Sequence, residues 1–263
     1  GTLAALEDAF AQVVGSVNGP RVGCIDDAGV RRLNQRVALT TYGFAPDAEW
    51  RIHEHLHSEG GQRFTLTGPG TSVEVSLEKP GTHLASNAAG VLAFVAELGY
   101  DVSGAARAVA DFAGVRRRYE IRARVQGVTI VDDYAHHPTE VAASIQAASF
   151  GTHGNVVVVF QPHRYTRTAD LGPQFGGPLA MAHHTVVTDV YGAGEQPIIG
   201  VSGRIVAAAS DAAGGSTTYI PSISDVVSFV AELAQPGDTI LLLGAGDITT
   251  IAMPIALAIE DRS

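Results

Sequence analysis

The feature that most constrains the fold is a repeated alternation of apolar runs and helical segments after residue 118. The runs VVVVF, HTVVTDVY, TTYIP and DTILLLG follow one another, separated by helical patterns. Such alternation predicts parallel strands joined by right-handed crossover helices that cover both faces of a sheet. The preceding runs, YEIRARV and VTIVDDY, predict a hairpin. We therefore expect residues 116–263 to form a doubly wound, mostly parallel α/β sheet of about six strands.

Residues 1–115 have a different pattern. A helical period from Leu3 to Val13 precedes RVGCI, which is typical of a short buried strand. EWRIHEHLH, QRFTLT and TSVEVSL alternate in twos between Gly-rich turns, which predicts an antiparallel meander. Helices are expected near residues 85–98 and 102–112. The three histidines of the meander, His53, His55 and His57, are expected on one strand face, as a polar surface rather than a metal site.

Composition excludes several classes of function. The 263 residues are 46% apolar and carry a formal net charge of −10, with Lys79 as the one lysine. No basic face for nucleic acid is expected from this balance. No apolar run approaches the ~20 residues that span a bilayer, and the first residues lack a signal-peptide pattern. One cysteine, Cys24, excludes an intramolecular disulfide framework. We expect a cytoplasmic protein without membrane or nucleic-acid partners.

Polar clusters follow several of the predicted strands. VDDYAHHPTE follows VTI, PHRYTRT follows VVVVF, DVYGAGEQP follows HTVVT, and LGAGD follows DTILL. Each cluster by itself fits helix capping or turn chemistry. Ligands of open α/β sheets, however, bind beyond the carboxyl ends of the strands. Because all of these clusters belong at that edge, the sequence favours a common functional site there.

In this order and spacing the clusters resemble the carboxy-terminal domain of the Mur ligases. Upstream, GTHLASNAAG and FAGVRRRYE resemble the end of the central ATP-binding domain of that family and its junction to the last domain. The resemblance implies that residues 116–263 are a whole Rossmann-like last domain and residues 1–115 the second half of a central α/β ATPase domain. It is closest to the branch that joins L-alanine to UDP-N-acetylmuramate. Tyr134 stands where the branch that recycles murein tripeptide usually has Phe.

The resemblance implies ATP-dependent amide formation in peptidoglycan precursor synthesis. The muramate carboxylate would take the γ-phosphoryl group of ATP to become an acyl phosphate, which the amine of L-alanine then attacks. A fixed guanidinium group suits a carboxylate because it binds both oxygens at once. Arg164 and Arg167, three residues apart, are therefore expected to hold the alanine carboxylate. Tyr134 and His163 would line the pocket, and His136 would orient alanine or accept its proton.

Other residues match the ATP side of the family. His83 and Asn87 correspond to adenine-contacting positions, and Asp133 is expected at the ribose or at a magnesium-bound water. One of the arginines of the triplet 116–118 is expected to reach the ATP phosphates, and Arg117 is taken as the candidate. Asp132 is interpreted as a structural hydrogen-bonding acid.

A Gly-rich phosphate loop followed by Lys and Ser or Thr does not occur in this sequence, and neither do the family's central-domain magnesium ligands. We therefore expect a truncated, inactive chain whose ATP and Mg²⁺ are held mostly by an absent segment, and no metal site of its own. The truncation would also leave RVGCI without a paired strand and expose an apolar face, which a homodimer could cover. The alternatives are a non-catalytic fragment that binds alanine or nucleotide, the tripeptide-recycling ligase, and an unrelated doubly wound domain that serves as an assembly surface.

We expect the 263-residue chain by itself to release no phosphate from ATP, with or without Mg²⁺. Without the amides and Lys of a phosphate loop, the β and γ phosphates have no cradle. A phosphate-release assay with an intact Mur ligase as the positive control measures this. A magnesium-dependent rate near that of the intact enzyme would contradict the expectation.

Overall fold

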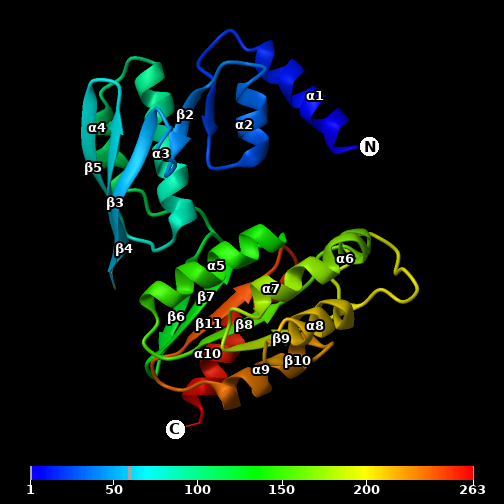
Figure 1. The fold of residues 1–263 in the computed structure, drawn as a ribbon. Helices are drawn as coiled ribbons and strands as arrows, with labels where there is room; N and C mark the ends of the chain where they lie inside the picture. The colour runs from blue at the N-terminus through cyan, green and yellow to red at the C-terminus, as the bar shows by residue number, and fades with distance from the viewer. Residues whose placement is uncertain (1, 59–60, 263) are drawn as a thin grey trace. The chain divides into compact units, whose positions relative to one another are not determined.

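The computed structural model describes residues 2–58 and 61–262 and divides into two compact units, Gly1–Ala113 and Gly114–Ser263 (Figure 1). Unit 1 contains a mixed sheet in the order β1-β2-β3-β4-β5, in which β1, β2 and β3 are parallel and β3, β4 and β5 form the predicted antiparallel meander. Its elements are α1 (Leu3–Gly15), β1 (Val22–Cys24), α2 (Ala28–Asn34), β2 (Thr40–Gly43), β3 (Trp50–Ser58), β4 (Gly61–Gly68), β5 (Thr71–Leu77), α3 (Thr82–Glu97) and α4 (Val102–Ala110). The assignment of this unit as half of an ATP-binding domain stays a prediction.

The core of unit 1 lies between the sheet and α3. Phe64, Leu66 and Val75 point from β4 and β5 toward the small residues Ala85 and Ala89 of α3, and all five are fully or almost fully buried. Small side chains on the helix let it approach the sheet closely, so that the larger strand side chains fill the layer between them.

The expectation that RVGCI has no strand partner is wrong. Within this stretch, β1 pairs in parallel with β2, with Val22 opposite Thr40 and Cys24 opposite Tyr42. The four residues of β2, TTYG, are too few and too polar to show the alternation of apolar and polar residues that identifies a strand. The sequence pattern for that reason did not reveal β2. β1 nevertheless lies at one edge of this sheet, and the homodimer stays a prediction.

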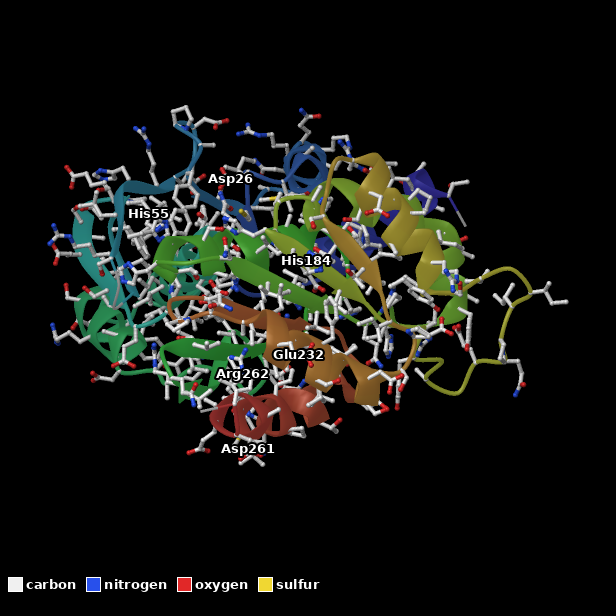
Figure 2. The ribbon with its side chains drawn as sticks, turned by 90° about the horizontal axis from the view of Figure 1, so that it is seen from below. Asp26, His55, His184, Glu232, Asp261 and Arg262 are labelled. Carbon is white, nitrogen blue, oxygen red and sulfur yellow. The ribbon has the colours of Figure 1, made fainter. Side chains whose placement is uncertain are left out.

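The expectation that the three histidines share a strand face is also wrong. The pairing of β3 with β4 shifts register between His53 and Leu56, and Glu54 has a φ of 51°. This bulge places two residues of β3 opposite one residue of β4. After the bulge, the residues of β3 that would have pointed to one face of the sheet point to the other face. His53 therefore bonds the exposed Thr67 hydroxyl at 2.9 Å, whereas His55 bonds the side chain of buried Gln62 at 2.6 Å (Figure 2).

Unit 2 confirms the predicted doubly wound fold. Its six-stranded sheet has the order β10-β9-β8-β11-β7-β6, and every neighbouring pair is parallel except β6 and β7, the predicted hairpin. The elements of unit 2 are β6 (Glu120–Val125), β7 (Val128–Asp133), α5 (Pro138–Gly151), β8 (Val156–Phe160), α6 (Tyr165–Leu171), η1 (Gly172–Phe175), α7 (Gly176–Leu179), β9 (His184–Val187), α8 (Gly203–Ala212), β10 (Thr217–Tyr219), α9 (Ile223–Leu233), β11 (Thr239–Leu243), η2 (Asp247–Ile251) and α10 (Ala252–Glu260).

Helices cover both faces of this sheet (Figure 1). Leu241 and Leu243 of β11 pack in a cluster with α5, α7 and α8, whereas Ile240 and Leu242 pack in a second cluster with α9 and α10. Successive side chains of a strand point to opposite faces, so when both faces are covered a run such as Ile240–Leu243 is apolar at consecutive positions. Arg262 donates to the carbonyl oxygens of Glu232 and Ala234 and so ties the segment after α10 to the end of α9 (Figure 2).

No helix in residues 2–58 and 61–262 combines the length and the apolar character that a membrane crossing needs.

We expect Leu242→Ala to lower the free energy of unfolding of unit 2 by about 2–5 kcal/mol, because it removes a fully buried side chain and leaves a cavity. Leu257→Ala is the control, since Leu257 is 56% exposed on α10 and its loss should cost about 0.5 kcal/mol or less. Amide exchange of the β11 strand under native conditions measures both effects. Equal protection in the two variants would contradict the two-faced burial of β11.

Candidate functional site

The polar segments that follow β7, β8, β9 and β11 are joined by direct contacts, as the strand pattern predicted. Gln161, just after β8, donates to Asp247 Oδ1 at 2.7 Å and accepts from the backbone N–H of Ile248 at 3.2 Å. These two partners follow β11. His163 pairs with Tyr191, which follows β9, through an isolated parallel bridge. The carboxyl ends of these strands therefore carry one continuous polar surface in unit 2.

The two aspartates at the end of β7 are both buried. Asp133 accepts the backbone N–H of Tyr119 at 2.9 Å and that of Ala135 at 2.8 Å. Asp132 accepts the hydroxyl of Thr249, which agrees with the interpretation of Asp132 as a structural acid. Both carboxylates are thus engaged by their own chain, and a contact of Asp133 with a nucleotide stays a prediction. Burial, followed by the negative charge of Asp133, raises the pKa of Tyr119 to about 12.

Two arginines compensate the buried charge of Asp132. Arg117 Nε lies 3.4 Å and Arg122 Nη1 lies 3.5 Å from Asp132 Oδ2. Arg117 also donates from Nη2 to the Gly244 carbonyl at 2.6 Å, and its guanidinium carbon lies 5.0 Å from the centre of the Tyr134 ring. A buried carboxylate is costly unless it is paired, so this contact fixes Arg117 between the ends of β7 and β11. Of the triplet 116–118, Arg117 is the least exposed.

A row of aromatic rings crosses the strand ends. Tyr134 and His136 meet edge to face with centres 5.2 Å apart, His136 and His163 lie 5.7 Å apart, and His163 stacks on Tyr191 at 5.8 Å. The row brings together the predicted pocket residues Tyr134, His136 and His163. It adds Tyr191, which belongs to one of the clusters that the sequence singled out but was not chosen as a site residue.

Hydrogen bonds define the proton positions on the two histidines. His136 Nδ1 lies 2.8 Å from the Tyr134 carbonyl oxygen, which can only accept, so the neutral ring carries its proton on Nδ1 and leaves Nε2 as an acceptor. His163 Nδ1 lies 3.4 Å from Arg167 Nη1, which can only donate. Burial, His136 and the charges of Arg167 and Arg164 lower the pKa of His163. The site thus holds two neighbouring imidazole rings, and the ring of His163 contacts Arg167.

The two predicted carboxylate-binding arginines occupy the start of α6. Arg164 is the N-cap residue with a φ of 68°, and its side chain is 52% exposed. Arg167 lies in the first turn of the helix and contacts His163. Besides burial and His136, the positive charges of both arginines lower the pKa of His163. That residues 164 and 167 serve one pocket stays a prediction.

The adenine candidates belong to unit 1. His83 is half-buried in the first turn of α3, and Asn87 is exposed one turn further along the same helix. Contact of either residue with a nucleotide stays a prediction.

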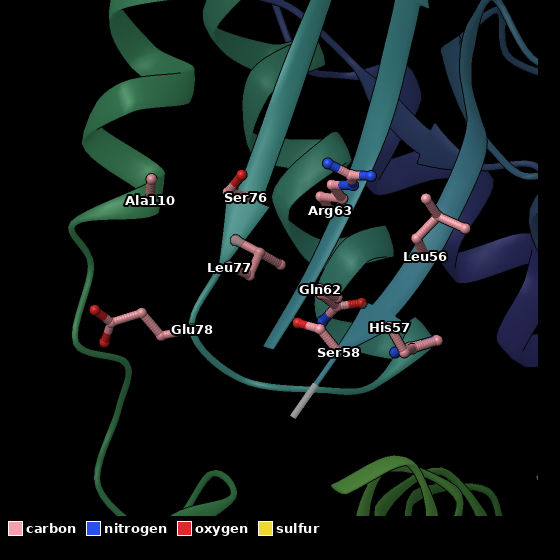
Figure 3. A pocket seen from close by; sticks show the side chains of 9 residues that line it. All are labelled: Leu56, His57, Ser58, Gln62, Arg63, Ser76, Leu77, Glu78 and Ala110. Carbon is pink, nitrogen blue, oxygen red and sulfur yellow. The ribbon is translucent and has the colours of Figure 1, made fainter. Parts of the chain in front are cut away.

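A shallow depression of about 620 Å³ also lies in unit 1, and none of the predicted site residues lines it. Figure 3 shows its lining side chains: Leu56, His57, Ser58, Gln62, Arg63, Ser76, Leu77, Glu78 and Ala110. Over residues 2–58 and 61–262 no three Cys, His, Asp or Glu side chains are grouped to hold a metal ion.

The sequence reasoning missed Gln161, Tyr191, Glu195 and Asp247 as individual site residues. All four lie within or directly beside the quoted clusters, so their position after a strand was a signal. Their side-chain types did not distinguish them from turn residues, because their partners lie 27 or more positions away in the chain: Asp247 is 86 residues from Gln161, and Glu195 is 29 residues from Thr166.

Comparison with known proteins agrees with this geometry. The family described as Mur ligase, glutamate ligase domain, matches residues 117–246. The UDP-N-acetylmuramate--L-alanine ligase of Acidothermus cellulolyticus is 40% identical over 97% of this chain and 55% of its own length. The enzyme of the same name from Clavibacter michiganensis is 39% identical over 99% of this chain and 55% of its own length. The chain therefore spans little more than half the length of these curated relatives.

Solved structures show the same fold. The UDP-N-acetylmuramate-alanine ligase of Thermotoga maritima has a TM-score of 0.77 and 24% identity, and the match covers 100% of this chain and 56% of that one. The MurF ligase of Thermotoga maritima in complex with ADP has a TM-score of 0.75 and 17% identity over 100% of this chain and 59% of that one. This chain belongs to the Mur ligase family, and residues 117–246 form its carboxy-terminal ligase domain.

Proposed function

We propose that this chain is part of an ATP-dependent ligase that joins L-alanine to UDP-N-acetylmuramate through an acyl phosphate, in the synthesis of peptidoglycan precursors. The observation that carries the proposal is the arrangement at the strand ends of unit 2, where Arg167 contacts His163, Arg164 begins the same helix, and the His136 ring lies 5.7 Å from the His163 ring. Relatives at 36–40% identity that are named UDP-N-acetylmuramate--L-alanine ligase support the choice of amino acid.

The arrangement suits a zwitterionic amino acid. The two guanidinium groups would bind the carboxylate of L-alanine, which fixes the amine at a set distance from them. An ammonium group must lose a proton before it can attack an acyl phosphate. His136 Nε2 would accept that proton, because Nδ1 is committed to the Tyr134 carbonyl. Tyr134 and His163, on either side of His136 in the ring row, would line the alanine pocket.

The nucleotide side of the proposal depends on Arg117, Asp133, His83 and Asn87. Arg117 is held between Asp132 and Gly244 at the strand ends, and from there it would meet the phosphates of ATP. ATP would supply the phosphoryl group, and Mg²⁺ would accompany it. The proposed compartment is the cytoplasm, in agreement with the free thiol of Cys24.

In the complete ligase, we expect Arg164→Ala and Arg167→Ala each to raise the KM for L-alanine by at least roughly 30-fold, with a much smaller change in the KM for ATP. Loss of one partner of a desolvated charge pair costs about 2–5 kcal/mol. Arg→Lys should restore part of the affinity, because an ammonium group lacks the planar pair of donors.

Arg204→Ala is the matched control for these variants. Arg204 lies over the Tyr219 ring, 4.5 Å from its centre, and has no place in the proposed site. Steady-state kinetics with L-alanine and ATP varied separately distinguishes the cases. An unchanged KM for L-alanine in both Arg variants would remove the proposed amino-acid site.

A further inference from the structure

The turn from Gly192 to Glu195 packs against the first turn of α6. Glu195 N–H donates to the Gly192 carbonyl at 2.9 Å, and the two central residues, Ala193 and Gly194, have φ values of 50° and 87°. Positive φ at both central positions is typical of a tight, mirror-image turn. Gly192 lies so close to Tyr165 that an added Cβ would approach the Tyr165 ring to 3.1 Å. The turn therefore packs closely against Tyr165 at the start of α6.

Tyr191 holds the backbone just before α6. Its N–H donates to the Pro162 carbonyl at 2.9 Å, and its carbonyl accepts the Arg164 N–H at 2.8 Å. These bonds fix Arg164 in its left-handed conformation, which is uncommon for a residue with a side chain. The direction of the Arg164 side chain consequently depends on contacts from the segment that follows β9.

Glu195 completes this support through the residue between the two arginines. Its Oε2 accepts the Thr166 N–H at 3.0 Å, and its Oε1 accepts the Thr166 hydroxyl at 2.7 Å. The Arg164 guanidinium is farther away, with Nη1 at 4.0 Å from Oε1. The bonds from Thr166 lower the pKa of Glu195 and keep it ionised. Both short hydrogen bonds of the Glu195 carboxylate are therefore made with Thr166. The Arg164 guanidinium is left able to bind another carboxylate.

We propose that Glu195 is a positioning residue for the amino-acid site: by holding Thr166 it fixes the first turn of α6, and thereby the directions of Arg164 and Arg167. The inference rests on the proposed function of those arginines and adds a determinant of their geometry. Glu195 acts through hydrogen bonds to Thr166 rather than through its charge, because its contact with Arg164 is long and its side chain is 23% exposed to water.

The test compares Glu195→Ala with Glu195→Gln in the full chain. A Gln amide can accept the Thr166 N–H and donate to the Thr166 hydroxyl oxygen, so it keeps both bonds and removes only the charge. L-Alanine is titrated into each variant, and the imidazole NMR signals of His163 report its binding. We expect Glu195→Ala to bind L-alanine roughly tenfold more weakly, and Glu195→Gln to stay within about twofold of the wild type. Asp211→Asn, at an exposed position of α8, is the control for loss of one negative charge.

A second readout needs no ligand. The Thr168 N–H bonds the Arg164 carbonyl at 3.0 Å within the first turn of α6. Its exchange with solvent should accelerate in Glu195→Ala and remain slow in Glu195→Gln, whereas exchange of the β11 amides should be unchanged in both. Thr166→Val, which removes the hydroxyl, should weaken binding moderately and add little in the Glu195→Ala background.

Equal L-alanine affinity in Glu195→Ala and wild type would overturn the inference, as would a Gln variant as weak as the Ala variant, since charge would then be the cause. If the wild type shows no binding of L-alanine, the proposed amino-acid site fails instead. In that case Thr168 exchange decides the positioning role by itself: acceleration in the Ala variant supports it, and unchanged exchange rejects it.

Discussion

The insertion of β11 between β7 and β8 is the interaction on which the arrangement of the site depends. Leu243 lies opposite Asp133 on one side and opposite Phe160 on the other. The three strands therefore end in the same row of the sheet, and the residues that follow, among them Tyr134 and Gln161, begin side by side at its carboxyl edge. Successive side chains of a strand point to opposite faces of the sheet. If β11 paired one residue out of register with β7 or β8, its side chains would turn to the opposite apolar clusters, and the polar segments would no longer lie side by side.

Positively charged side chains gather at the strand ends of unit 2, although the whole chain carries a net negative charge. The protein carries a formal net charge of −10, yet Arg117, Arg164 and Arg167 gather at the carboxyl edge of one sheet. Buried Asp132 holds Arg117 in place, and Arg167 contacts His163 of the aromatic row. The nearby carboxylates Asp133 and Glu195 accept hydrogen bonds from backbone and hydroxyl groups of their own chain, whereas Asp132 also pairs with Arg117.

The sequence predicted unit 2 and the convergence of its polar clusters because strands buried on both faces contain continuous apolar runs, such as VVVVF and ILLL, which few other structures tolerate. It did not predict β2, whose four residues are too few to show a period, or the bulge at Glu54, which a period of two cannot reveal. Glu195 was missed for a different reason. Its role depends on a contact with Thr166, and a sequence pattern contains no information about which distant residue a side chain will meet.

The place of β11 in chain order has a consequence for biosynthesis. A ribosome delivers β7, β8, β9 and β10 before β11, although β11 lies between the first two of them. Until its residues emerge, β7 and β8 each present an unsatisfied strand edge, and Arg117 lacks the Gly244 carbonyl as a hydrogen-bond acceptor. The gap between β7 and β8 must therefore stay unfilled after all the other strands of the sheet have been synthesised. Folding of this unit is for that reason expected to be a late, non-local event, in which a holding chaperone has its greatest opportunity to act.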